Sequence, residues 1–372
     1  MKPETVFVHA GAEPDAATAA IAPPLHLSTT YRHGPAGERE HGYEYIREAN
    51  PTQDRFEAAL AAIEHGEAAL AFASGMAATT ALLQAVPAGG HVLVPRDVYH
   101  GTRAYARDFL AERRVTTDIV DATSLDAIRA AWRKETALVW LETPSNPLIE
   151  ITDVAAVSEL AHARGAIVGV DSTFASPALQ NPLVIGADVV MHSTTKYLGG
   201  HSDVMGGALV FRRRDEWHER CEARRTLQGA VMAPFNAWLT LRGLRTLSCR
   251  IERHCANARA VAEFLAQHPA IARVRWPGLA SHPQHALARR QMRDFGGMMS
   301  IEVAGGREAA LKLASRVELF TNATSLGGVE SLIEHRASVE GAHAVSPPSL
   351  LRLSVGLEHA DDLVADLARA LA

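Results

Sequence analysis

A single lysine stands between two apolar runs near the middle of the chain. The first run ends in Ser193, Thr195 and Lys196, and a second run at 206–211 follows after two glycines. An amine held in a partly dry site has a lowered pKa, and it can then form a Schiff base with an aldehyde. The pattern therefore makes Lys196 a candidate for covalent chemistry on a carbonyl group.

Other polar side chains follow apolar segments in the same way. The segment 137–142 delivers Glu142 and then the run 143–147, which contains Asn146, and the segment 166–171 ends in Asp171. In an open α/β sheet, ligands gather outside the carboxyl ends of the parallel strands, so these side chains and Lys196 should converge. Each alone is more often a solvated side chain or a helix cap, and the inference depends on the combination.

A lysine, an aspartate and hydroxyl groups in one crevice suit pyridoxal phosphate. Its aldehyde can form a Schiff base with the lysine amine, and its pyridine nitrogen needs a carboxylate such as Asp171 to stay protonated. Its phosphate needs hydroxyls and free backbone N–H groups, which the turn at 73–78 offers where it enters a helix. The sequence contains no GxxxxGK[ST] and no strand followed by GxGxxG, so nucleoside triphosphates and dinucleotides are poor alternatives.

Composition narrows the class of protein. The 372 residues carry a formal net charge of -5 without a basic block, so nucleic acid and anionic membranes are not expected partners. No apolar run reaches the roughly 18 residues of a membrane span, and the N-terminus lacks a signal pattern, so we expect a cytoplasmic protein. The three cysteines fit reduced thiols. Cys249, His254 and Cys255 do not share one helix face, and we expect no metal site.

The elements that must position these residues alternate along the chain. Helical patterns occur at 52–66, 74–86, 124–135 and 152–165, and short apolar segments at 91–95, 137–142, 166–171, 188–193 and 206–211. This alternation predicts an α/β fold with a mostly parallel sheet covered on both faces. Residues 1–50 have no clear periodicity and are expected to form an extended arm that contacts a neighbouring subunit. We place a large domain at 51–235 and a smaller one at 236–372, which begins with a long helical stretch.

Eight motifs in order resemble the Cys/Met-metabolism family of pyridoxal-phosphate enzymes. They are YIREANPT, FASGMAA, DVYHGT, LETPSNP, GVDSTF, HSTTKYLGGHSDVMGG, SLGGVESLIEH and LRLSVGLE, and they cover almost the whole chain. The family includes cystathionine γ-synthase, cystathionine γ-lyase, cystathionine β-lyase and methionine γ-lyase. The resemblance implies the aminotransferase-like fold (fold type I) and pyridoxal 5'-phosphate as cofactor.

The resemblance also implies roles for matching residues around the cofactor. Lys196 would hold it covalently and carry protons, Asp171 would pair with its ring nitrogen, and Tyr99 would stack on its ring. The phosphate would be held by Gly75, Met76, Ser193 and Thr195, and by Tyr45 and Arg47 from the neighbouring subunit. The family's usual form is a tetramer built from dimers that share active sites.

On the substrate side, the resemblance implies that Arg352 binds the α-carboxylate with the help of Asn146 and Ser325. Glu330 would hold the distal ammonium group of cystathionine. Two departures concern this side: the arginine usual after the stacking tyrosine is replaced by Ala104, with Arg103 one place early, and Arg336 stands where proline is common.

The reaction expected from the resemblance is at Cγ of a small sulfur amino acid. Cystathionine γ-lyase, which yields cysteine, 2-oxobutanoate and ammonia, is the first reading. Cystathionine γ-synthase, which joins an activated homoserine to cysteine, is the alternative, followed by methionine γ-lyase and cystathionine β-lyase. A non-catalytic binding module is disfavoured because Lys196, Asp171, Tyr99 and Arg352 are all retained.

Overall fold

The computed structural model describes residues 1–341 and 344–372 and contains two sheets. The larger sheet has the strand order β1-β7-β6-β5-β4-β2-β3. Its strands are β1 (Ala68–Phe72), β2 (His91–Pro95), β3 (Thr116–Val120), β4 (Thr136–Glu142), β5 (Ile167–Asp171), β6 (Val189–His192) and β7 (Gly207–Phe211). Only β7 runs antiparallel to its neighbours, and the other pairs are parallel. The predicted mostly parallel sheet is therefore confirmed.

Helices cover both faces of this sheet, as the sequence pattern predicts. Along β6, Val189 and Met191 pack into the core formed with α3 (Gly75–Ala85) and α8 (Glu216–Gln228). Val190, on the opposite face, packs into the core formed with α2 (Pro51–Glu64). Further along the sheet, α5 (Leu125–Ala130) and α6 (Val154–His162) cover β4 and β5, while α4 (His100–Asp108) and the 3-10 turn η1 (Ala111–Arg113) follow β2. Alternate burial on two faces is what turns these strands into continuous apolar runs.

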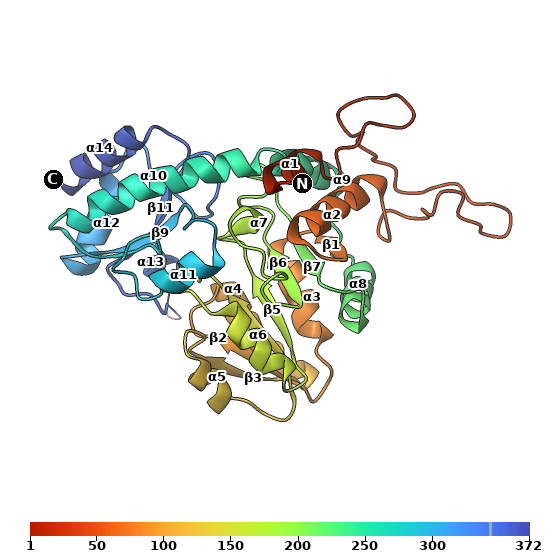
Figure 1. Ribbon diagram of the computed structural model, residues 1–372, viewed down its shortest axis with the longest axis horizontal. Coiled ribbons are helices and arrows are strands. Elements are labelled where there is room, and N and C mark those ends of the chain that lie inside the picture. Colours follow the sequence, from red (N-terminus) through yellow and green to blue (C-terminus); the bar gives the residue numbers. More distant parts are fainter. Residues whose placement is uncertain (342–343) are drawn as a thin grey trace.

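The second sheet has the order β10-β11-β12-β9-β8 and lies on the other side of the molecule in Figure 1. Its strands are β8 (Ile271–Arg275), β9 (Met298–Val303), β10 (Thr321–Asn322), β11 (Leu332–His335) and β12 (Leu350–Ser354). The helices α10 (Leu247–Gln267), α12 (Gly306–Arg316) and α14 (Ala360–Leu371) share one apolar core with it. Short helices α7 (Ser176–Leu179), α11 (His285–Gln291) and α13 (Arg336–Glu340) lie between larger elements.

Two expectations about helices were wrong. The N-terminal arm is not extended throughout, because α1 (Pro3–His9) begins with a proline in its first turn and buries Phe7 in the core of α2. The long helical stretch is two helices, α9 (Pro234–Leu244) and α10, separated at Arg245 and Thr246. The side chain of Arg250 donates to the carbonyl of Gly243, so a terminal acceptor of α9 is satisfied without helix continuation.

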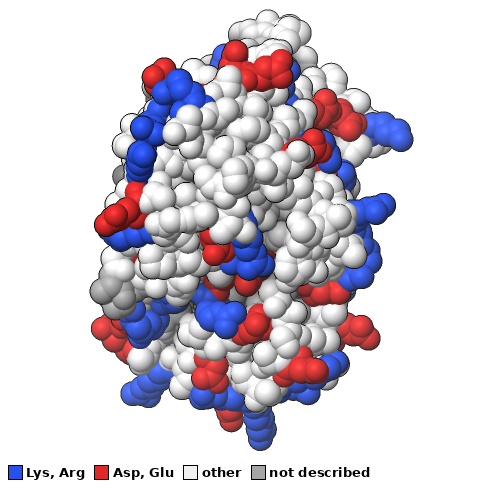
Figure 2. Space-filling model, turned by 90° about the vertical axis from the view of Figure 1, so that its left-hand side faces the viewer, with Lys and Arg blue, Asp and Glu red and all other residues white. Residues whose placement is uncertain are grey.

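The rest of the arm runs as loops away from the body of the molecule (Figure 1). The division at residue 235 into a large and a small domain stays a prediction. Among the described residues, no helix has both the length and the apolar character needed to cross a membrane. The face in Figure 2 mixes acidic and basic side chains rather than separating them by sign. All three cysteines are free, and Cys249 is the exposed one.

Candidate active site

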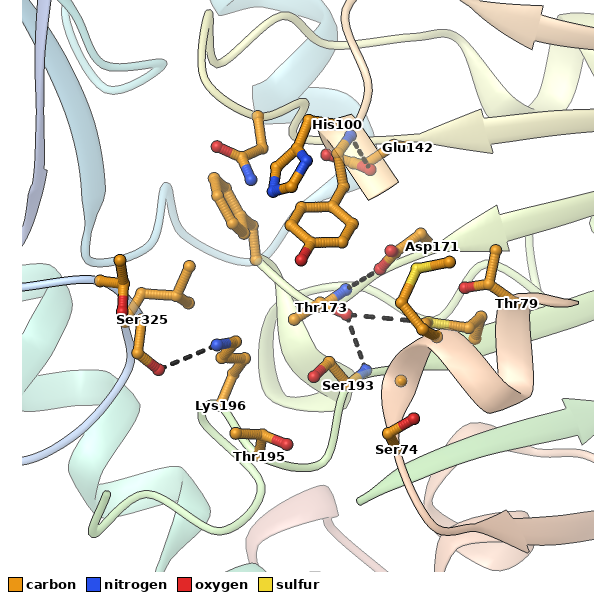
Figure 3. A pocket seen from close by; sticks show the side chains of 18 of the residues that line it. Ser74, Thr79, His100, Glu142, Asp171, Thr173, Ser193, Thr195, Lys196 and Ser325 are labelled. Carbon is orange, nitrogen blue, oxygen red and sulfur yellow. Dashed lines mark hydrogen bonds between the residues drawn. The ribbon is translucent and has the colours of Figure 1, made fainter. Parts of the chain in front are cut away.

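A cavity of about 510 Å³ lies at the carboxyl ends of β4, β5 and β6. It brings together Glu142 and Asp171, which are register neighbours on β4 and β5, and Lys196, which follows β6. Ser325 and Arg352, far along the chain, line the same cavity. The predicted convergence of strand ends is therefore confirmed, and Figure 3 shows the labelled side chains around the opening.

The amine of Lys196 lies inside this cavity with one close partner. Its Nζ donates to the hydroxyl of Ser325 at 2.8 Å (Figure 3). Burial, followed by the nearby charge of Arg352, lowers the pKa of Lys196 to about 8. An amine with this pKa is neutral far more often at pH 7 than an ordinary lysine, so it can attack an aldehyde.

Two buried carboxyl groups stand side by side at the floor of the cavity. Asp171 accepts a hydrogen bond from the backbone N–H of Thr173 at 2.9 Å, and Glu142 accepts one from the backbone N–H of Tyr99 at 2.9 Å. Burial raises the pKa of both groups, and the charge of Asp171 raises that of Glu142 further. The two groups titrate as a pair, and a pyridinium cation bound beside Asp171 would favour its charged form.

The start of α3 forms a hollow suited to a phosphate group. Ser74 caps the helix by accepting from the N–H of Ala77 at 3.1 Å, which leaves the first-turn N–H groups of Gly75 and Met76 without helical acceptors. A Cβ atom at Gly75 would stand 2.9 Å from the Cβ of Ser193 and would fill the hollow. The hydroxyl-bearing Ser193 and Thr195 line the same wall.

These groups fit pyridoxal phosphate. A lysine with a lowered pKa, a buried carboxyl group and a helix N-terminus free of side-chain bulk share one cavity, and each suits a different part of that cofactor. Tyr99 also lines the cavity, with its ring centroid 4.6 Å from that of His100.

Arg352 forms the opposite wall and is held by three acceptors. Its guanidinium donates to Asn146 Oδ1 at 3.0 Å, to the carbonyl of Ser325 at 3.1 Å and to Glu334 Oε2 at 2.8 Å. Burial and the charge of Arg336 lower the pKa of Arg352 to about 10, so it stays a cation at neutral pH. A guanidinium fixed in this way is suited to a two-pronged contact with a carboxylate.

Three predicted site residues do not line the cavity of a single chain. Tyr45 and Arg47 lie on the arm, where Tyr45 is 43% exposed and the Arg47 guanidinium sits 5.5 Å from its ring centroid. Arg47 also donates to the carbonyl of Thr226 at 3.2 Å. Glu330 accepts a hydrogen bond from the hydroxyl of Ser202 outside the cavity wall. Their roles toward a cofactor or substrate stay predictions.

The structure also brings in residues to which the sequence analysis assigned no role. The hydroxyl of Thr173 accepts a hydrogen bond from the N–H of Ser193 at 2.9 Å and so links the ends of β5 and β6. Its place two residues after Asp171 could have suggested this role. Glu334 pairs with Arg352 because the two are register partners on β11 and β12. That pairing leaves no signature in sequence spacing, since the two residues stand on separate strands.

Comparison with known proteins gives the family. The family described as Cys/Met metabolism PLP-dependent enzyme matches residues 4–372. The chain belongs to this family of pyridoxal-phosphate enzymes. Cystathionine γ-synthase of Mycobacterium tuberculosis is 50% identical over 375 residues, 99% of this chain and 96% of that protein. Cystathionine γ-lyase of Dictyostelium discoideum is 44% identical over 99% of this chain and 97% of its own length.

A solved structure of a cystathionine enzyme has the same fold as this chain. Cystathionine γ-synthase from Xanthomonas oryzae pv. oryzae, in complex with aminoacrylate and cysteine, superposes with a TM-score of 0.95 at 43% identity, covering 100% of this chain and 98% of that one. The predicted aminotransferase-like fold, pyridoxal phosphate as cofactor, and an enzyme class of carbon–sulfur lyases and γ-replacement transferases are thereby confirmed.

Proposed function

We propose that this enzyme acts at Cγ of an amino acid whose γ-substituent is replaced or eliminated. The observation that carries the proposal is the meeting of Lys196 and Arg352 in one cavity, where a proton-carrying amine faces a carboxylate anchor. Pyridoxal phosphate, when bound, accepts the electron pair that remains after the Cα–H bond breaks.

The protein's own residues would supply the proton transfers and the orientation. Arg352, helped by Asn146 and Ser325, holds the α-carboxylate and so aims the Cα–H bond at Lys196. The Lys196 amine would take that proton, and a second proton would leave Cβ as the γ-substituent departs, because burial lowers the pKa of Lys196 to about 8. In replacement the thiol sulfur bonds to Cγ and protons return to Cβ and Cα, whereas in elimination Cγ takes a proton. Asp171 would pair with the ring nitrogen of the cofactor, and Tyr99 would pack against its ring.

The remaining predicted residues complete the cofactor site. Gly75, Met76, Ser193 and Thr195 hold the phosphate from within the chain. The arm supplies Tyr45 and Arg47 to a neighbouring subunit, which makes a dimer the smallest complete unit and a tetramer of two dimers the expected assembly. The separation of these two residues from the cavity of their own chain supports this part of the proposal.

Formation of cystathionine from an activated homoserine and cysteine is the reaction that we place first. The support is the name cystathionine γ-synthase on relatives 50% identical to this chain. Cleavage of cystathionine at Cγ, the first reading from the sequence, is the second candidate, because relatives 44% and 41% identical are named cystathionine γ-lyase. The two reactions share every step until the γ-substituent has left.

Product analysis by mass spectrometry separates the candidates. The holoenzyme is mixed with L-cystathionine alone and, separately, with O-acetyl-L-homoserine and cysteine. Cystathionine formed in the second mixture supports the synthase, whereas cysteine and 2-oxobutanoate from the first support the lyase. Homocysteine and pyruvate would mean cleavage at Cβ and would contradict the proposal. Lys196→Ala is the matched control, and substantial turnover in it would refute the role of Lys196.

A further inference from the structure

The loop that follows β4 carries Asn146, one of the acceptors that hold Arg352. Both side chains are 4% exposed, and Asn146 Oδ1 accepts from Arg352 Nη1 at 3.0 Å. The loop is closed on itself by backbone hydrogen bonds. The N–H of Ser145 donates to the carbonyl of Glu150 at 3.0 Å, and the N–H of Ile149 donates to the carbonyl of Ser145 at 3.2 Å. A shift of the backbone at Ile149 would therefore move Asn146 with it.

Ile149 has a strained backbone conformation. Its φ is +57°, in the left-handed region that a β-branched residue rarely adopts. Its side chain is buried in the core formed with α2. A conformation of this kind persists only where the surrounding structure holds it, and such residues cluster at binding sites. The loop would therefore relax if the contacts that hold Ile149 were lost.

Two buried side chains from the C-terminal part of the chain hold this loop from outside. Ser300 Oγ, on β9, donates to the carbonyl of Pro147 at 2.7 Å, and Ser300 is the register partner of Arg352 on β12. His282, in the segment between β8 and α11, has its Nε2 3.0 Å from the carbonyl oxygen of Ile149. Ser300 thus ties the loop to the sheet that carries Arg352, and His282 holds the strained residue itself.

The two backbone partners of His282 decide which of its ring nitrogens carries the proton. A carbonyl oxygen can only accept, so Nε2 is the donor toward Ile149. The backbone N–H of Gln284 can only donate, so Nδ1, at 3.2 Å, is its acceptor. Burial, opposed by the bond to Ile149, lowers the pKa of His282 to about 4. The ring is therefore neutral at pH 7, and its one proton stays on the bond to Ile149.

We propose that His282 is a positioning residue for the carboxylate of the substrate. By holding the carbonyl of Ile149 it keeps the strained turn in place, and the turn keeps Asn146 aligned with Arg352. Ser300 supports the same loop from β9. The inference rests on the proposed function, in which Arg352 binds the α-carboxylate, and it adds two residues that do not line the cavity.

Steady-state kinetics of the holoenzyme with O-acetyl-L-homoserine and saturating cysteine give the first test. His282→Phe keeps an aromatic ring without an N–H, so KM should rise about tenfold while kcat and the affinity for pyridoxal phosphate change by less than about twofold. His282→Gln retains a side-chain N–H and should recover most of the loss. His285→Phe is the matched control, because His285 bonds to the carbonyl of Pro277 and not to the loop, and its KM should match the wild type. Ser300→Ala, a smaller change at the second contact, should raise KM in the same direction, and it decides the question if His282→Phe does not fold.

A binding test makes the result independent of turnover. L-Norleucine and L-norleucinamide lack a γ leaving group and differ only at the carboxylate. Calorimetry on the holoenzyme should show tighter binding of L-norleucine, and His282→Phe should reduce this preference about tenfold. A general loosening of the fold would weaken the binding of both ligands alike and would leave the preference unchanged.

The outcomes separate this inference from the proposed function. A KM and a ligand preference that His282→Phe leaves unchanged overturn the inference while Cγ chemistry stands. An equal rise in KM for His285→Phe, or a loss confined to kcat, also overturns it. If neither O-acetyl-L-homoserine nor cystathionine is turned over but His282→Phe still reduces the preference for L-norleucine, the proposed function fails and the positioning role stands. If the wild type binds L-norleucine no better than its amide, the inference is refuted whatever the turnover.

Discussion

Replacing Lys196 with methionine should make the cofactor-free protein more stable at neutral pH. Burial lowers the pKa of this lysine from 10.5 to about 8, so the folded state holds the proton less tightly than the unfolded state does. That gap corresponds to about 3 kcal/mol of destabilisation below pH 8, where both states are protonated. Loss of the hydrogen bond to Ser325 offsets about 1 kcal/mol. The net gain expected for Lys196→Met is about 2 kcal/mol.

The pH dependence gives this prediction its sign. Between the folded pKa and the unfolded pKa, the unfolded state binds more protons, so the stability of the wild type rises with pH. The advantage of Lys196→Met should therefore fall from about 2 kcal/mol at pH 7 to near zero by about pH 9.5.

Urea unfolding of the cofactor-free proteins at equal chain concentration measures this difference. Lys312→Met is the matched control, because Lys312 is exposed on α12 and its replacement should change stability by less than about 0.5 kcal/mol. The reasoning is refuted if Lys196→Met is no more stable than the wild type at pH 7. It is equally refuted if the advantage is the same at both pH values.

Three further substitutions test the site. Gly75→Ala places a methyl group 2.9 Å from the Cβ of Ser193. We expect the affinity for pyridoxal phosphate, titrated by visible absorbance, to fall about tenfold or more. An unchanged affinity would contradict a phosphate site at the start of α3. Arg352→Lys would lose the proposed forked contact with the substrate carboxylate, so KM should rise about 100-fold while the absorbance of the bound cofactor is kept. A normal KM would remove Arg352 from the substrate site. Asp171→Asn cannot carry the charge that the ring nitrogen needs, and kcat in a steady-state assay should fall about 100-fold or more; retained kcat would assign that role elsewhere.

Most strands of the larger sheet could be predicted from the sequence, because the pattern that identifies a strand lies within the strand itself. Apolar segments of five or six residues separated by helical patterns identify buried strands, and β2, β4, β5, β6 and β7 lie where those segments were found. The side chain of Ser124, the first residue of one predicted helical segment, caps α5 by accepting from the N–H of Ala127 at 3.2 Å. β1 and β3 went unassigned: β1 is rich in alanine, and β3 is polar and partly exposed.

Helix ends and the arm were less predictable because long-range contacts decide them. Helix periodicity continues across residues 235–268, yet Arg250 reaches back to Gly243 and to the carbonyl of Tyr197, and the chain turns there. Likewise, α1 has few residues of its own with which to hold a helix, and it depends on burial of Phe7 against α2. Tyr197 and α2 both stand far along the chain from the residues that they contact.

The sequence by itself determined which polar groups gather at the strand ends. Lys196, Asp171 and the turn at Gly75 each belong to a short motif, and parallel strands deliver their ends to one edge of a sheet whatever the detailed packing. What only the tertiary structure decided is which charges meet on the substrate side. The register of β11 against β12 sets Glu334 beside Arg352, and the position of α13 adds Arg336 and Glu340. Electrostatic interaction depends on distance and burial in space, and neither quantity is encoded in the spacing of residues along a chain.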